Sequence, residues 1–213
     1  AEVSQSEQDY KAAFAAYRQA TELKPDFPEA LLNLGDIATQ LSRLEEAQAA
    51  YEKLLSLQPN HPRVHLALGN IYSRQEKFPE AIRHYQQAIK QDANLIEAYY
   101  NLGFVAIREG RLDDAAERFN AALKVRPELP QTHYFLGEIY VEQKRFEQAG
   151  RAYQRAIEIQ PTFARAYQQL AHLYGIQGIH FDKALKLAQK AVELQPDSAD
   201  SFNTLSWLYY LNK

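Results

Sequence analysis

The six histidines and the acidic residues near them are the side chains of this sequence that could ligate a metal or transfer a proton. His61 and His65 are four residues apart, a spacing that can hold zinc on one face of a helix. However, Pro62 stands between them and no nearby carboxylate completes a ligand set, so helix capping and packing explain the pair better. His84 follows Glu80 by one helical turn, which predicts a surface pair. The sequence thus predicts no metal site.

The motifs with which many enzymes hold substrates or cofactors are also missing. The sequence has no glycine-rich phosphate loop, no nucleophile elbow and no pair of carboxylates at a predicted cleft. With no cysteine, disulfides, thiol catalysis and cysteine-ligated metals are excluded. His172 is expected on a binding surface, where a polar contact is favoured over a pH-sensitive one. We therefore predict that this segment is not an enzyme and binds no cofactor.

A unit of 34 residues recurs along the chain and positions all of these side chains. It is clearest over residues 96–129, where Ile96 is counted as position 1. Leucine fills position 7, at Leu34, Leu68, Leu102, Leu136, Leu170 and Leu205. Small residues fill position 8, at Gly35, Gly69, Gly103, Gly137, Ala171 and Ser206. Position 24 is occupied by Tyr17, Tyr51, Tyr85, Phe119, Tyr153 and Ala188. Small residues at positions 8, 20 and 27 let two helices approach, and large residues fill the space around that contact.

These landmarks, together with a proline at position 32 in all repeats but one, resemble the tetratricopeptide repeat (TPR) family. The family's tryptophan at position 4 is replaced by Leu31, His65, Tyr99, His133, Tyr167 and Phe202. The resemblance implies an all-α, right-handed superhelical α-solenoid of antiparallel helix pairs, which we predict to be one domain over residues 1–213. The predicted parts are a partial repeat 1–27, repeats 28–61, 62–95, 96–129, 130–163 and 164–198, and a partial repeat 199–213.

Both terminal parts are incomplete repeats, which suggests a fragment of a longer TPR array. In the first, a helix is expected from about Asp9 to Lys24, and the last is a lone first helix. Repeat 164–198 carries one extra residue in its turn. The net charge of −3 argues against nucleic acid as a partner, because backbone binding needs a basic stripe. No run could span a membrane and no signal peptide begins the chain, so we expect a soluble protein. The sequence leaves the compartment unknown, whether cytoplasmic or periplasmic.

In the TPR family, positions 2, 5, 6, 9, 12 and 13 of each first helix line the concave groove, and the resemblance implies the same here. The carboxylate clamp of the family is absent, and its asparagine ladder is matched at position 6 only by Asn33 and Asn101. An apolar centre instead comprises Tyr100, Phe104, Ile107, Tyr134, Phe135 and Val141, although packing between repeats would also explain Phe135 and Ile107. The predicted partner-binding residues are Asn33, Asn70, Arg74, Tyr100, Asn101, Phe104, Ile107, Arg108, Tyr134, Phe135 and Glu138.

The predicted function is a protein–protein interaction scaffold that binds a peptide or helix of a partner protein in this groove. One alternative is a structural spacer or oligomerisation array that self-associates through its apolar C-terminal helix, which contains Phe202, Tyr209 and Tyr210. Another is a targeting arm of a larger protein whose activity lies outside this segment.

Overall fold

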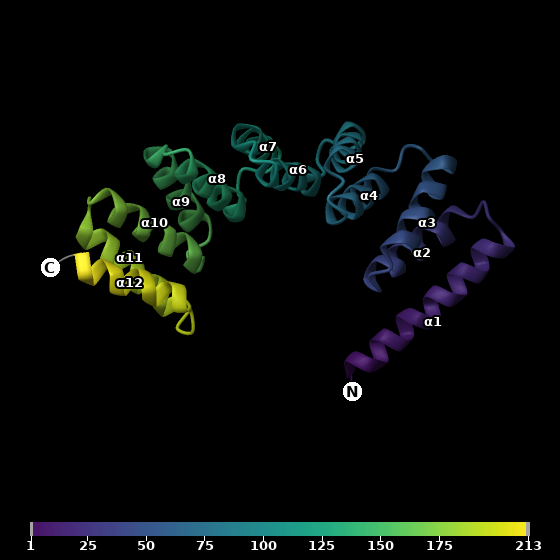
Figure 1. Cartoon of the computed structure of the whole chain (residues 1–213), viewed down its shortest axis with the longest axis horizontal. Helices are drawn as coiled ribbons and strands as arrows, with labels where there is room; N and C mark the ends of the chain where they lie inside the picture. The colour runs from purple at the N-terminus through teal and green to yellow at the C-terminus, as the bar shows by residue number, and fades with distance from the viewer. Residues whose placement is uncertain (1, 212–213) are drawn as a thin grey trace. The chain divides into compact units, whose positions relative to one another are not determined.

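The computed structural model describes the backbone of residues 2–211 and the side chains of residues 7–211. Within that range the chain forms twelve α-helices and no strand. The helices are α1 Glu2–Leu23, α2 Pro28–Gln40, α3 Leu44–Leu57, α4 Pro62–Arg74, α5 Phe78–Gln91, α6 Ile96–Arg108, α7 Leu112–Val125, α8 Pro130–Glu142, α9 Phe146–Ile159, α10 Ala164–Gln177, α11 Phe181–Leu194 and α12 Ala199–Leu211. From α2 onward they follow the predicted repeats, with a first and a second helix in each complete repeat (Figure 1). Helix α1 begins at Glu2, so the predicted start near Asp9 was wrong.

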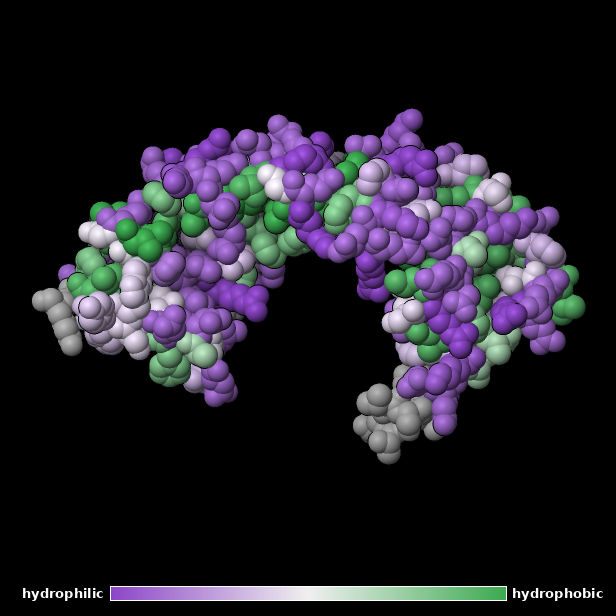
Figure 2. Space-filling model, viewed as in Figure 1, coloured by the Kyte–Doolittle hydropathy of each residue, from purple (hydrophilic) through white to green (hydrophobic). Residues whose placement is uncertain are grey.

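The chain divides into two compact units, residues 1–105 and residues 106–213, which we call the N-terminal and C-terminal units. In the N-terminal unit α2 packs on α3 and α4 packs on α5, and in the C-terminal unit α8 packs on α9 and α10 packs on α11. In the view of Figure 2, hydrophilic side chains cover most of each unit, and small hydrophobic patches are scattered among these side chains. No helix in the described residues is long and apolar enough to cross a membrane.

The turn between the two helices of a repeat is set by the residue at position 15. This residue has a left-handed backbone in every complete repeat, at Ser42, Glu76, Gly110, Lys144 and Gly178. The next residue then returns its backbone N–H to the first helix, as in Lys77 N to Tyr72 O at 2.9 Å and Arg145 N to Tyr140 O at 2.7 Å. These bonds satisfy carbonyl groups that the helix end leaves free, and they fix the direction of the second helix.

A glycine and a tyrosine hold the two helices of a repeat together. The rings of Tyr51, Tyr85 and Tyr153 are almost fully buried. Each ring lies directly over the glycine at position 8, so that a Cβ built at Gly137 would lie 2.6 Å from Cδ1 of Tyr153. Real Cβ atoms essentially never approach an atom so closely, so these three complete repeats favour glycine opposite their tyrosine. Repeat 164–198 avoids the conflict by placing alanine at both positions, Ala171 and Ala188.

The extra residue of repeat 164–198 changes its turn. Gly178 has φ +65° and His180, two residues later, has φ +52°. Helix α10 consequently ends one residue later in its repeat than the other first helices, at Gln177. Near that end Gly175 makes room for the next first helix, because a Cβ there would lie 2.5 Å from Cζ3 of Trp207 and 2.7 Å from Cδ2 of Leu208 on α12. The close approach of α10 and α12 positions the side chains that line the site described next.

Candidate binding surface on the first helices

The hydroxyl groups of the buried tyrosines also reach side chains of the first helix in the same repeat. Tyr51 donates its hydroxyl proton to Asp36 Oδ1 at 2.6 Å, and Tyr85 donates to Asn70 Oδ1 at 2.9 Å. Tyr153 makes the equivalent hydrogen bond to Glu138. Each acceptor stands at position 9 of its repeat, fifteen residues before the tyrosine. The core therefore determines which side chains position 9 presents on the surface of the first helices.

The sequence follows this rule in the two repeats without a tyrosine. Where position 24 is Phe119, which has no hydroxyl, position 9 is Phe104, which has no acceptor. Where position 24 is Ala188, position 9 is His172. In these two repeats the side chain at position 9 thus accepts no hydrogen bond from the side chain at position 24. His172 is exposed, and Phe104 is 37% exposed.

In the N-terminal unit the structure brings together two pairs of the predicted site residues. Asn101 donates its side-chain amide to Asn70 Oδ1 at 2.7 Å, which links α6 to α4. The rings of Tyr100 and Phe104 are 6.2 Å apart on α6. Asn33 on α2 is half-buried, and Arg74 at the end of α4 is exposed.

In the C-terminal unit the predicted residues are Ile107, Arg108, Tyr134, Phe135 and Glu138. Tyr134 forms an aromatic cluster, with its ring centroid 5.5 Å from Phe135 and 5.3 Å from Phe163. Phe135 also stacks on Phe119 of α7 at 5.8 Å, so packing between neighbouring repeats accounts for part of its surface. Ile107 is half-buried and Arg108 is exposed.

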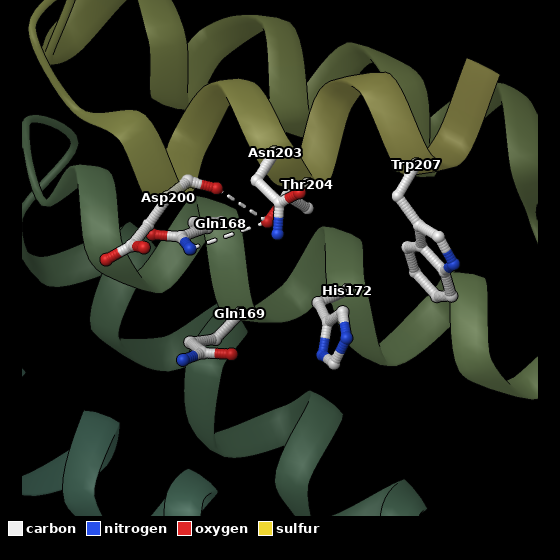
Figure 3. Close-up of a pocket in the computed structure, with 7 residues that line it drawn as sticks. All are labelled: Gln168, Gln169, His172, Asp200, Asn203, Thr204 and Trp207. Atoms are coloured by element: carbon white, nitrogen blue, oxygen red, sulfur yellow. Dashed lines mark hydrogen bonds between the residues drawn. The ribbon is translucent and has the colours of Figure 1, made fainter. Parts of the chain in front are cut away.

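Two adjoining hollows lie on the first helices of the C-terminal unit. The first has a volume of about 210 Å³, and we call it the carboxylate hollow. It is lined by Glu138, Val141 and Glu142 of α8, Tyr153 of α9, and Gln169, His172, Leu173 and Ile176 of α10. The second, the amide hollow, has a volume of about 330 Å³. It is lined by Gln168, Gln169 and His172 of α10 and by Asp200, Asn203, Thr204 and Trp207 of α12 (Figure 3). Gln169 and His172 border both hollows.

A small network fixes the floor of the amide hollow. Gln168 donates its side-chain amide to the Thr204 hydroxyl at 3.4 Å. The same hydroxyl donates to the backbone carbonyl of Asp200 at 3.0 Å (Figure 3). The rings of His172 and Trp207 are 5.0 Å apart and inclined at 45°, and they close one end of the hollow.

The charge of the two hollows is one-sided. Three carboxylates line them, those of Glu138, Glu142 and Asp200, and no lysine or arginine does. Burial raises the pKa of Glu138 above its usual value, while the hydrogen bonds from Tyr153 and Tyr134 act in the opposite direction. In a surface of this kind, amides can pair with a peptide backbone, and an aromatic ring can pack on an apolar or cationic group.

Sequence reasoning missed the contribution of α12. Asp200, Asn203, Thr204 and Trp207 occupy positions 2, 5, 6 and 9 of the partial repeat 199–213. These are the same positions that define the groove in the complete repeats. Extending the groove positions to the partial repeat would have identified all four residues.

A second cluster, in the N-terminal unit, corrects the prediction for His84. This histidine is 8% exposed, so it is buried and does not form the predicted surface pair. Its Nδ1 lies 3.0 Å from Nδ1 of His65, whose Nε2 lies 3.2 Å from the carbonyl oxygen of Pro59. In neutral rings, His65 Nε2–H donates to that carbonyl, and His84 Nδ1–H donates to His65. The described residues contain no group of three His, Asp or Glu able to hold a metal ion.

Family models match consecutive stretches of the chain. Two models described as "Tetratricopeptide repeat" match residues 5–71 and 100–162, a third with this description matches 152–186, and one described as "TPR repeat" matches 69–108. The helix pairs already place the chain among the all-α solenoid proteins. With these matches, the chain belongs to the tetratricopeptide repeat family.

Solved structures give the same fold. A crystal structure of MamA is 28% identical, with a TM-score of 0.71 over 81% of this chain and 93% of that one. The C-terminal part of a TPR repeat-containing protein from Cytophaga hutchinsonii is 20% identical, with a TM-score of 0.82 over 96% and 84%. YrrB, described as a TPR protein with an unusual peptide-binding site, is 21% identical, with a TM-score of 0.71 over 90% and 98%. A search of curated proteins gave no match. The family and the similarity to MamA support a role as a protein-interaction scaffold.

Proposed function

We propose that the chain is a protein-interaction module and that the C-terminal unit binds an extended segment of a partner protein across α8, α10 and α12. The observation that carries the proposal is the pair of adjoining hollows on these three first helices. Each helix contributes one stripe of side chains at helical spacing, such as Asp200, Asn203 and Trp207 on α12.

The chemistry of the amide hollow suits a peptide backbone. Gln168, Gln169 and Asn203 each offer an amide donor and a carbonyl acceptor, which is the complement of a peptide unit. Trp207 adds a large, rigid apolar surface of the kind that dominates binding energy at interfaces. Volumes of about 210 and 330 Å³ suit a few residues of extended chain rather than a folded domain.

A preformed surface lowers the cost of binding. The residues lie on helices held by buried packing, so little ordering of the receptor is needed when a segment binds. The peptide-binding site named for YrrB, a structure of the same fold, supports a peptide as the ligand class.

The test is a selection of peptides from a random dodecapeptide display library against the whole chain. We expect Trp207→Ala to weaken binding of the selected peptides about thirtyfold, the loss typical of an aromatic hot spot. Tyr210→Ala is the matched control, because Tyr210 is an aromatic residue of α12 that is 74% exposed and lines neither hollow. Circular dichroism checks that both variants stay folded. Selected peptides that bind the Trp207→Ala variant as tightly as the natural chain would refute the proposal.

A specific observation favours a second candidate, self-association through α12. Phe202, Tyr209, Tyr210 and Leu211 on this helix are 47%, 49%, 74% and 40% exposed. Exposed apolar side chains gathered on one helix are typical of a contact surface. If these side chains form the main contact, light scattering will show assemblies of the natural chain that Tyr210→Ala dissociates and Trp207→Ala leaves intact.

A further inference from the structure

The walls of the carboxylate hollow combine two kinds of chemistry. Val141, Leu173 and Ile176 provide aliphatic surface, and Glu138 and Glu142 provide carboxylates one helical turn apart on α8. The hollow therefore has an apolar wall and an acidic rim within about 210 Å³, a volume that suits one long side chain.

Neither carboxylate is neutralised by the protein. Glu138 is half-buried and accepts a hydrogen bond from Tyr153, but neither it nor Glu142 forms an ion pair with a described residue. Arg165, the basic residue one turn before Gln169 on α10, lines neither hollow. A half-buried carboxylate without a cation is costly, and a ligand that supplies the cation recovers part of that cost.

We propose that the carboxylate hollow is the specificity pocket for a lysine or arginine side chain of the bound partner segment. The inference rests on the peptide-binding function proposed above. The methylene stem of the side chain packs along Val141 and Ile176, and its charged head reaches the carboxylates of Glu138 and Glu142. The backbone of the segment continues past Gln169 into the amide hollow, which shares this residue.

Other occupants fit less well. An acidic segment would meet three carboxylates, because Asp200 lines the neighbouring hollow. A metal ion lacks ligands, since no group of three His, Asp or Glu in the described part of the chain can hold one. A purely apolar side chain would bury the carboxylate of Glu138 further without supplying a cation. Charge and shape together thus select a long cationic side chain.

The test uses peptides selected from the random dodecapeptide library by the whole chain, resynthesised and measured by fluorescence anisotropy. We expect a lysine or arginine at one fixed place in the selected peptides, and we expect its replacement by norleucine to weaken binding at least about tenfold. The double variant Glu138→Gln/Glu142→Gln should weaken binding of the parent peptide to a similar extent and that of the norleucine peptide hardly at all. Glutamine keeps an acceptor for the Tyr153 hydroxyl, so these substitutions preserve the packing of α8.

The control variant, Glu147→Gln/Asp197→Asn, removes the same charge from residues outside both hollows and should bind the peptide as the natural chain does. Peptides that lose affinity with Trp207→Ala but carry no preferred basic residue, or are indifferent to Glu138→Gln/Glu142→Gln, would overturn this inference and leave the peptide-binding function standing. Peptides indifferent to Trp207→Ala would overturn the peptide-binding function and this inference with it. An equal loss in the control variant would show general charge attraction and also overturn the specificity pocket.

Discussion

Alanine substitution of two glycines in the same repeat should change stability in opposite directions. Gly137 of α8 faces the ring of Tyr153, and an added Cβ would lie 2.6 Å from Cδ1 and 2.8 Å from Cζ of that ring. Gly150 of α9 faces Leu173, and a Cβ there would lie 3.7 Å from Cδ2, an ordinary van der Waals contact. Both glycines lie inside helices and neither has a positive φ, so the backbone accepts alanine at both.

The magnitude follows from two opposing terms. Forcing a methyl group into a packed core costs about 1 to 3 kcal/mol. Alanine in a helix interior gains about 0.5 to 1 kcal/mol over glycine. Gly137→Ala should therefore destabilise the protein by about 1 to 2 kcal/mol, which lowers the melting temperature by about 3 to 6 °C in a chain of this size. Gly150→Ala should stabilise it by about 0.5 to 1 kcal/mol, because only the helix term remains.

The assay is urea unfolding followed by circular dichroism for the two variants and for a cycle with Tyr153→Val, which leaves no side-chain atom beyond Cγ. In the Tyr153→Val background the clash is gone, so Gly137→Ala should become stabilising, with a coupling of about 2 kcal/mol. The natural pair Ala171 and Ala188 already has alanine at both positions. If Gly137→Ala is neutral in the natural chain, or costs the same in both backgrounds, the close contact of ring and glycine does not control this position.

Three further outcomes follow from the N-terminal unit and the turns. Burial, assisted by His65 and by the charge of Arg83, lowers the pKa of His84 to about 4, so the folded chain binds fewer protons than the unfolded chain between about pH 4 and 6.5. The free energy of unfolding should therefore have its full value above pH 6.5 and fall by roughly 1 to 2 kcal/mol towards pH 4, a range that allows for screening of the histidine by solvent. His84→Gln should flatten this part of a plot of the free energy of unfolding in urea against pH. At position 15, where φ is positive, Ser42→Gly should stabilise by about 0.5 to 1 kcal/mol and Gly110→Ala should destabilise by about 1 kcal/mol in thermal unfolding. Tyr85→Phe removes the hydrogen bond to Asn70 and should cost about 0.5 to 1 kcal/mol in the same assay, because Asn70 keeps its bond from Asn101.

The helices were predictable because their boundaries depend on local chemistry. Proline occupies the first position of α2, α4 and α8, where its missing N–H costs nothing. The small and large residues at positions 8, 20, 24 and 27 make the contact between two helices, and the 34-residue period repeats that contact. The start of α1 was not predictable in this way, since residues 2–8 lie outside any repeat landmark and no turn from a first helix defines where the helix starts.

The site was harder to predict from the sequence, because its residues come from several helices and its shape depends on how closely these helices pack. Glu138, Gln169 and His172 stand at groove positions 9, 6 and 9 of their repeats, and all three line the carboxylate hollow. The groove positions did not indicate a hollow, because the approach of α12 to α10 depends on Gly175 at position 12, where the other complete repeats carry larger residues. The burial of His84 was missed for a similar reason: its partner His65 is nineteen residues away on another helix.

Position 9 connects the stability of a repeat to its binding chemistry. A tyrosine at position 24 stabilises the repeat only if its buried hydroxyl finds an acceptor, and in three repeats that acceptor is Asp36, Asn70 or Glu138. An acceptor of this kind presents a polar or acidic group on the surface of the first helix. In repeat 130–163 the carboxylate of Glu138 both satisfies Tyr153 and forms the acidic rim of the carboxylate hollow. In repeat 164–198 and the partial repeat 199–213, position 9 is free of this demand, and it carries His172 and Trp207 beside the amide hollow. The residues at position 24 thus influence where this surface can be acidic and where it can be aromatic.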